Sequence, residues 1–475
     1  MKWYSSILFL FCFVVDLTAQ TYLKSEYFKL SRRNTKIKLI GKANNDFFLA
    51  FTGQKDIQLA SYNEELNFNW IKTLPEQDKN TLIEAIQCFQ DSVYIFHSLN
   101  NGFTKRYYIK SLNSDVGHGT EIFKQKQSRS VMSQRFGLVV SRDLNSLMCY
   151  IIDDANKESF NIKYIVLNKD LNVISKNSLK LPFTIEDTRI KKAVLDNEQR
   201  VFFLIHHRNS QKQDQDYLKY KYMLAYKGIN DIALKDLGEK NSFLSSVSLK
   251  YNPINDMLWV IGFYSKVRAG KIEGLYNESF DLTKEEPVSL FKNNRAISSD
   301  ILDRLILKDP EKEQDISHLE VIKIVNRSDG GLLIFGEENY STIVNYTSPN
   351  VYNVYSMNNI TYFHYNNVLV TAINAKGEIQ WNNILRKKQM IENEQSFVSC
   401  FVYILNDEVR CYYNNDITRN NTLMRSDILS NGKVNSISEF KELLYIEQCV
   451  QTGRKEWVGL ISDNGNIRLI KYMGQ

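Results

Sequence analysis

The sequence has little that points to enzymatic chemistry. It contains no Gly-x-Ser-x-Gly motif, no His-Glu-x-x-His motif and no phosphate-binding glycine loop, which leaves nucleophile-elbow hydrolases, zinc peptidases and P-loop enzymes without support. The six histidines are scattered. His206 and His207 are adjacent in a predicted strand, so their rings point to opposite faces and cannot share a metal. We expect no catalytic residue, no metal and no cofactor, and a non-enzymatic role is favoured over an enzymatic one.

Long apolar runs and clustered charge are also missing. No run after the N-terminus is long enough to cross a bilayer, so we expect no transmembrane segment in the mature chain. The net charge of +6 is spread thinly, without a Lys/Arg tract. Nucleic acid is therefore not an expected partner.

The N-terminus predicts export. Lys2 lies in a short basic start, residues 7–15 form an apolar run, and Ala19 provides the small residue before a cleavage site. These features are typical of a signal peptide over residues 1–19, with an uncleaved anchor as the alternative. The mature chain, residues 20–475, is then periplasmic, attached to the cell surface or secreted.

Cysteine is scarce, and the mature chain would keep an odd number of thiols, five. Each lies in an apolar, strand-like run, which favours buried free thiols. Cys400 and Cys411 flank one predicted turn, but their inferred register makes them diagonal neighbours about 7 Å or more apart, beyond disulfide reach. Although export would permit disulfides, we do not expect disulfides to stabilise this fold.

What the chain does have is strand-forming residues in a repeated pattern. Aromatic residues reach 12%, with 27 Tyr and 26 Phe, a composition that favours strands. Apolar strands alternate with short turns rich in Asn and Gly, which tolerate the positive φ angles of tight hairpins. The four-stranded units that result are 36–74, 83–124, 136–181, 190–236, 244–290, 319–385 and 397–440.

These units predict an all-β fold, a single β-propeller of about eight four-stranded blades. Residues 444–473 supply only three strands, and the alternating segment Tyr22–Leu30 could provide the fourth and so close the ring. Seven blades is the alternative, because one misread hairpin changes the number.

Two insertions interrupt the repeat. The first, residues 291–318, contains a predicted helix over Ile297–Leu307. The second, residues 338–367, is a Tyr/Asn-rich stretch too long for an ordinary hairpin loop, and it has the composition of a recognition loop. An extended hairpin whose tyrosines pack within the fold is the alternative. The candidate binding residues are Tyr340, Tyr346, Tyr352, Tyr355, Tyr362 and Tyr365.

One region carries a family resemblance. The segments Ile322–Glu337 and Asn367–Trp381 resemble a blade of uncharacterised secreted bacterial propeller-like proteins, over roughly residues 319–390. Ala372, Asn374, Gly377 and Trp381 are also similar to the Ala-x-Asp-x-x-x-Gly-x-x-x-Trp hairpins of quinoprotein-like propellers, one residue short and with Asn for Asp. The resemblance implies the propeller fold and export. It implies neither quinone binding nor dehydrogenase activity.

Together these patterns favour a non-enzymatic propeller of the cell envelope or the extracellular space that binds a protein partner through loops on one face. A propeller that binds or cleaves carbohydrate is the alternative, with tyrosines stacked on sugar rings. The predicted innermost strands are poor in Asp and Glu, which disfavours a glycosidase with its paired carboxylates.

Overall fold

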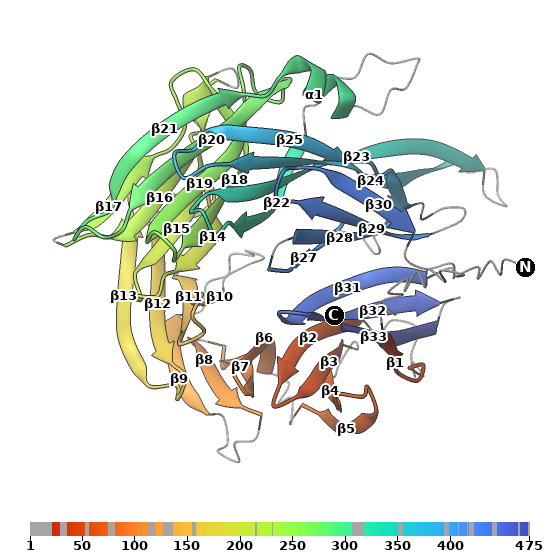
Figure 1. Ribbon diagram of the computed structural model, residues 1–475. Helices are drawn as coiled ribbons and strands as arrows, with labels where there is room; N and C mark the ends of the chain where they lie inside the picture. The colour runs from red at the N-terminus through yellow and green to blue at the C-terminus, as the bar shows by residue number, and fades with distance from the viewer. Residues whose placement is uncertain are drawn as a thin grey trace, which may run out of the picture.

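The computed structural model shows a β-propeller. It describes residues 21–28, 36–52, 57–74, 81–102, 104–112, 119–126, 136–153, 158–213, 216–229, 231–305, 318–349, 355–393, 399–406, 408–415, 417, 422–438, 444–463 and 466–473. Within these ranges the strands form eight antiparallel sheets that follow one another along the chain and surround a common centre (Figure 1). The predicted all-β fold with eight blades is confirmed, and the seven-blade alternative is wrong.

Blades 1 to 4 have four strands each and are numbered along the chain. Blade 1 comprises β2 (Lys36–Ala43), β3 (Asp46–Thr52), β4 (Ile57–Tyr62) and β5 (Phe68–Thr73). Blade 2 comprises β6 (Thr81–Phe89), β7 (Ser92–Asn100), β8 (Thr104–Ser111) and β9 (Thr120–Lys126). Blade 3 comprises β10 (Phe136–Val140), β11 (Ser146–Asp153), β12 (Phe160–Asn168) and β13 (Val173–Leu181). Blade 4 comprises β14 (Thr188–Leu195), β15 (Val201–Arg208), the 3-10 turn η1 (Tyr217–Lys219), β16 (Tyr220–Lys227) and β17 (Ile232–Asp236).

Blades 5 to 8 complete the ring. Blade 5 comprises β18 (Phe243–Asn252), β19 (Met257–Ser265), β20 (Ile272–Asp281) and β21 (Val288–Ala296). Blade 6 comprises β22 (Leu319–Asn326), β23 (Leu332–Pro349), β24 (Tyr355–Ile373) and β25 (Ile379–Leu385), with β26 (Gln389–Glu392) added against β24. Blade 7 comprises β27 (Phe401–Ile404), β28 (Glu408–Asn414), β29 (Leu423–Leu429) and β30 (Val434–Ser438). Blade 8 comprises β31 (Leu444–Gly453), β32 (Glu456–Asp463), β33 (Asn466–Met473) and the N-terminal β1 (Thr21–Lys24).

The hydrophobic core is divided among the interfaces between neighbouring blades. In β23, Leu332 and Ile334 pack toward blade 5, whereas Leu333 and Phe335 pack toward blade 7. Successive side chains of a strand point to opposite faces, and both faces of a blade are covered by its neighbours. This explains why the central strands are continuously apolar, as in Val201–Ile205, instead of alternating with polar residues.

Asparagine side chains shape the recurring hairpin turns. Asn63 Oδ1 accepts hydrogen bonds from Glu65 N at 3.1 Å and Asn67 N at 2.8 Å. Asn168 and Asn374 make the same pair of contacts two and four residues ahead. This Asx geometry holds the turn closed, so that Leu66 adopts a φ of 63° where glycine would be expected. The recurrence of Asn in the sequence therefore reflects one turn repeated around the ring.

Blade 8 unites the two ends of the described chain. β1 pairs antiparallel with β33, with Tyr22 opposite Tyr472, and Phe28 forms an isolated bridge with Ile467. Blade 8 also packs on blade 1, where Val458, Leu460 and Leu469 share a cluster with residues that include Phe47 and Leu49. The paired N-terminal strand is shorter than the predicted segment 22–30.

Both predicted insertions lie beside blade 6. The helix α1 (Ser299–Leu305) lies within the predicted range 297–307 and buries Leu302 and Leu305 in the cluster between blades 5 and 6. Asn367 Nδ2 donates to Leu305 O at 2.7 Å and so fixes the end of the helix.

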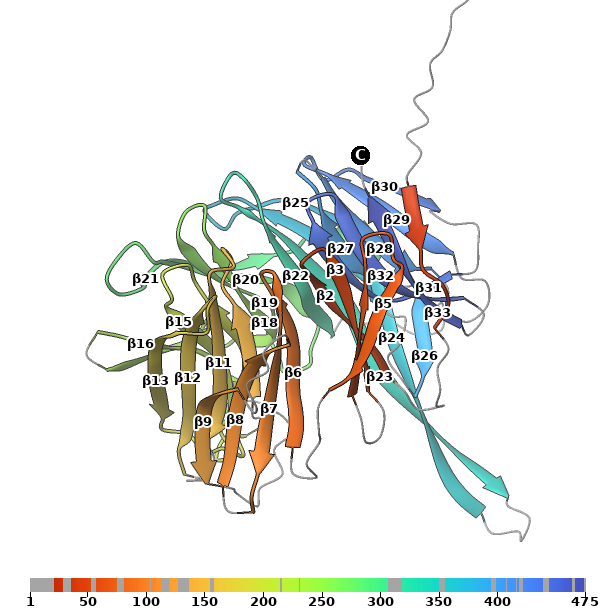
Figure 2. The same ribbon diagram turned by 90° about the horizontal axis from the view of Figure 1, so that it is seen from below.

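In the second insertion, β23 and β24 continue past the blade as a two-stranded ribbon, which projects from the body in Figure 2. This corresponds to the hairpin alternative rather than to an irregular loop.

Other predictions concern thiols and the membrane. Cys88, Cys149, Cys400, Cys411 and Cys449 are free thiols, and Cys411 lies opposite Val402 in the predicted register. In the part of the chain that the structure describes, no helix combines the length and the apolar character needed to span a membrane. The predicted signal peptide, residues 1–19, lies outside the described residues.

Candidate functional site

The ribbon that extends blade 6, called the arm below, consists of residues 339–349 of β23 and 355–365 of β24. A register shift between Glu337 and Asn339 separates it from the blade, and such bulges bend a strand and turn it in a new direction. β26 pairs with the arm only from Tyr362 to Tyr365. The arm therefore leaves the propeller at a defined kink and is widened to three strands near its base.

Two of the predicted tyrosines share one face of the arm. Tyr340 lies opposite His364, and Tyr362 lies opposite Thr342, two positions further along. The Tyr340 ring stacks on the His364 ring with centroids 4.5 Å apart and planes at 12°, while Thr342 Oγ1 lies 3.0 Å from His364 Nε2. His364 is thus held by its neighbours. Because His364 already covers one face of Tyr340, the arrangement does not favour the sugar-stacking alternative.

The remaining tyrosines are not gathered at that position. Tyr365 lies opposite Asn339 on the other face of the arm, and burial followed by the charges of Glu337 and Glu320 raises the pKa of its phenol. Tyr346 and Tyr355 pair through their backbones with Asn358 and Pro349. Tyr352 lies outside the described residues.

A buried ion pair anchors the base of the arm. Lys387 Nζ lies 2.6 Å from Glu337 Oε1, and both side chains are 0% exposed. Lys387 also donates to Tyr365 O at 3.0 Å and to Gln389 Oε1 at 2.9 Å. Ser399 Oγ donates to Glu337 Oε2 at 2.7 Å. Because a buried charge without partners is very unfavourable, these contacts fix the direction in which the arm leaves the blade.

Further out, the arm exposes apolar side chains and an open edge. Ile343 is 64% exposed and Val344 is 48% exposed, and as adjacent strand residues they face opposite sides of the ribbon. β23 pairs with β22 only as far as Glu338. From Asn339 onward, no strand among the described residues pairs with its outer edge. An exposed apolar ribbon with an unpaired edge is a surface that natural proteins usually protect.

A second feature, which the sequence did not indicate, lies on the inner wall of the ring. Lys192 on β14, Lys250 on β18 and Lys323 on β22 come from the first strands of three consecutive blades, and Arg142 follows the first strand of blade 3. We call these four residues the inner cations. Burial, followed by repulsion from the other three, lowers the pKa of Lys250 to about 8. Burial, Lys192 and Arg142 lower the pKa of Lys323 as well.

A cavity of about 380 Å³ adjoins the inner cations. Lys192 is one of the inner cations and also lines the cavity. The first strands of blades 4, 5 and 6 form most of the cavity wall. The polar lining residues are Lys191, Lys192, Ser245, Ser246, Ser248, His318, Glu320 and Asn339. Glu320 accepts a hydrogen bond from Asn339 Nδ2, so this carboxylate is already bound within the wall.

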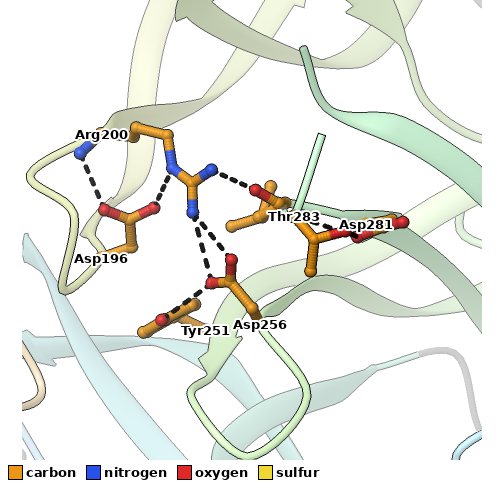
Figure 3. A network of polar contacts seen from close by, with 7 residues as sticks. Asp196, Arg200, Tyr251, Asp256, Asp281 and Thr283 are labelled. Carbon is orange, nitrogen blue, oxygen red and sulfur yellow. Dashed lines mark hydrogen bonds and ion pairs between the residues drawn. The ribbon is translucent and has the colours of Figure 1, made fainter. Parts of the chain in front are cut away.

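The cluster around Arg200 is rich in charge but serves to join two blades (Figure 3). Arg200 Nε lies 2.5 Å from Asp196 Oδ2 within blade 4, and Arg200 Nη2 lies 3.1 Å from Asp256 Oδ2 in blade 5. Tyr251 Oη donates to Asp256 Oδ1 at 2.9 Å, and Arg200 Nη1 donates to Leu282 O. The guanidinium is therefore occupied by partners on both blades, as expected for a structural staple.

The adjacent histidines occupy opposite faces of β15, as the sequence predicts. His206 packs on Tyr222, with ring centroids 4.8 Å apart, and His207 stacks on Phe183 at 4.3 Å. Burial, aided by nearby positive charges, lowers the pKa of His206 to about 4. Across the described ranges, no group of three or more His, Cys, Asp or Glu side chains is arranged to hold a metal ion.

Comparison with known proteins adds distant structural likenesses. No protein-family model and no curated protein matches the sequence. Among solved structures, the chain is similar to a prolyl endopeptidase, with a TM-score of 0.41 and 10% identity over 90% of this chain and 55% of that chain. It is similar to an uncharacterized protein from Listeria monocytogenes EGD-e, with a TM-score of 0.40 and 9% identity over 93% of this chain and 97% of that chain. It is also similar to prolyl oligopeptidase B from Galerina marginata, with a TM-score of 0.40 and 8% identity over 90% and 56% of the two chains.

The chain spans about half the length of the two peptidases that it resembles. At identities of 10% or less and TM-scores near 0.4, these likenesses carry no argument about activity. The propeller assignment stands on the eight sheets themselves, and the candidate sites on their own geometry.

Proposed function

We propose that this chain is an exported, non-enzymatic β-propeller of the cell envelope or extracellular space, which binds a protein partner through its arm. The arm carries the proposal. It joins exposed apolar residues on both faces, such as Ile343 and Val344, to a strand edge that is open beyond Asn339, whose N–H still donates to His318 O. Adding a partner strand to such an edge supplies main-chain hydrogen bonds, while alternate side chains provide specificity.

The anchored base supports this role. A two-stranded ribbon alone is only marginally stable in water, but the Lys387–Glu337 pair and β26 hold the first part of the arm in place. A preset direction lowers the entropy lost when a partner docks. The other predicted contact residues, Tyr346, Tyr352 and Tyr355, belong to the distal half of the insertion, where we propose that they contribute contact area.

A shortened arm tests the proposal. The variant replaces residues 342–362 with Asn-Gly and so joins Ser341 to its pairing partner Phe363, because a two-residue turn of this type suits a tight hairpin. It keeps the Tyr340–His364 stack and the Lys387–Glu337 pair. The tagged mature protein is used to capture partners from its own solubilised cell envelope, and captured proteins are identified by mass spectrometry.

We expect one stoichiometric partner for the intact chain and its loss for the shortened arm, while the thermal unfolding of the propeller stays unchanged. Capture of the same partner with equal affinity by both proteins would show that the arm is not the contact element. An intact chain that captures no stoichiometric partner would overturn the protein-binding role.

A further inference from the structure

The inner cations occupy related positions in successive blades. Lys192 and Lys323 each lie three residues before the end of the first strand, and each directly follows a β-bulge. Lys250 lies two residues before the end of its strand. Bulges redirect the side chains next to them. The ring geometry therefore collects cations that are distant in sequence on one side of the inner wall.

The inner cations have no anionic partner among the described residues, although Lys250 is half-buried; Arg142, Lys192 and Lys323 are exposed. None of the four forms an ion pair or side-chain hydrogen bond within the described residues, in contrast to Arg200 and Lys387. Asp143, next to Arg142 in sequence, is bound instead by Ser141 and Asn145. Like charges held close together repel one another, and an anion placed among them removes that repulsion. Half-buried Lys250, which water screens least, would gain most from such an anion.

The cavity beside the cluster supplies the remaining groups for anion binding. Ser246 Oγ accepts the Val321 N–H at 3.0 Å, which leaves its own O–H available to donate. Ser248 lies on the same strand and also lines the cavity, as does Ser245, whose hydroxyl already donates to Phe263 O at 3.3 Å. Hydroxyl and ammonium donors together match the oxygens of carboxylates and phosphates. The volume, about 380 Å³, lies at the lower end of the range for small-molecule sites.

We propose that the inner wall of blades 4 to 6 binds a small anion with two or more negative charges, a polycarboxylate or a phosphate-bearing compound, between the cavity and Lys192, Lys250 and Lys323. Several charges are required because a single carboxylate could neutralise only one of the lysines. This site is separate from the arm, so it does not depend on the proposed protein partner.

The test uses the full mature chain and two probes, citrate for polycarboxylates and inorganic pyrophosphate for phosphates. Isothermal titration calorimetry is carried out at constant ionic strength, with acetate as the monovalent comparison. We expect saturable one-to-one binding of at least one probe and weak or undetectable binding of acetate. The probe with the higher affinity identifies the preferred chemical class.

Two variants locate the site. Lys250→Met and Lys323→Met keep the apolar stem of the side chain and remove its charge, so each should weaken binding by about tenfold or more. The control Lys180→Met changes an exposed lysine on the outer strand of blade 3 and should leave binding unchanged. Absence of saturable binding by both probes, or equal weakening in all three variants, would overturn the proposal.

Thermal unfolding without anion separates a binding role from a structural one. A lysine that only stabilises the fold should lower the melting temperature when it is replaced. Lys250 and Lys323 should instead raise it, because each substitution relieves repulsion among the inner cations. A lower melting temperature for both variants would contradict the proposal, whatever the binding result.

Discussion

The Gln448 side chain accepts a hydrogen bond from Leu39 N at 2.9 Å, across 409 residues of sequence, and donates one to Ile37 O at 3.0 Å. Its amide thus imitates a short piece of strand pairing between the first strands of blades 8 and 1. Gln451 does the same for Ile404 in blade 7, with contacts of 3.1 Å and 2.7 Å. Side-chain amides therefore connect blade 8 to both of its neighbours.

Gln448→Ala should destabilise the protein by about 1–3 kcal/mol, because it leaves two backbone groups without their partners. Gln451→Ala should have a similar effect at the other side of blade 8. Equilibrium unfolding in denaturant measures both. Gln58→Ala, on β4 without an inter-blade hydrogen bond among the described contacts, should change stability by less than about 0.5 kcal/mol. Equal effects at Gln448 and Gln58 would remove the amide bridge as a source of stability.

Lys387→Met should cost about 3–5 kcal/mol of unfolding free energy, since it leaves the Glu337 carboxylate buried without its cation. Adding Glu337→Gln in the same chain should recover much of that loss, because the double variant buries no isolated charge. A double-mutant cycle in denaturant measures the coupling. Simple additivity of the two substitutions would show that the pair does not anchor the arm.

Ile343→Lys should weaken capture of the protein partner by tenfold or more without affecting the fold, because the side chain is 64% exposed and any contact there buries it. Ile254→Lys is the matched control, at 55% exposure on a turn of blade 5. Binding is measured with the partner found by affinity capture. If both variants bind equally well, Ile343 lies outside the interface.

Lys250 should make stability depend on pH. Its pKa is about 8 in the folded protein, below the value near 10.4 expected in the unfolded chain, so the unfolded state binds more protons between these values. The contribution of Lys250 to stability therefore rises as pH increases from about 8 to 10. Affinity for a polyanion should fall over the same range, because the ammonium loses its charge.

The measurement is the difference between the native protein and Lys250→Met, in denaturant at pH 7.5, 8.5 and 9.5 without added polyanion. Buried tyrosines and cysteines have raised pKa values, which make stability fall as pH increases. Their contributions are the same in both proteins and therefore cancel in the difference. His318 and Glu320 in the cavity and the other inner cations remain in both proteins. A difference that does not change with pH would refute the assigned pKa.

The blades could be predicted from sequence because each is a local unit. Continuous apolar strands such as Val201–Ile205 and Asn-rich turns such as Asn63–Asn67 follow each other at short range, and their spacing predicted seven complete units. The eighth was predicted only as three strands that an N-terminal segment could complete, which left seven blades as the alternative. The helix was predicted within two residues at each end. Local propensity and pattern agree throughout these segments, which is why the prediction succeeded.

The functional surfaces were harder to predict because they depend on the ring. Tyr340 and His364 stack only because an antiparallel register brings them together, and a Tyr/Asn-rich segment gives equal support to a loop and to a ribbon. The inner cations come from four blades, and each lysine taken alone resembles an ordinary strand residue. Aligning the first strands at their bulges would have given Lys192 and Lys323 equivalent positions in blades 4 and 6, but the bulges are known only from the structure.

The contact between blades 8 and 1 also has a consequence for synthesis. Blade 1 emerges from the ribosome early, but the face that covers it is completed only when the strand ending at Met473 has been made. At about 5–20 residues per second, that interval is on the order of a minute. During this time Phe47 and Leu49 lack their final neighbours. We therefore expect chaperones to bind the exposed apolar side chains of the nascent chain.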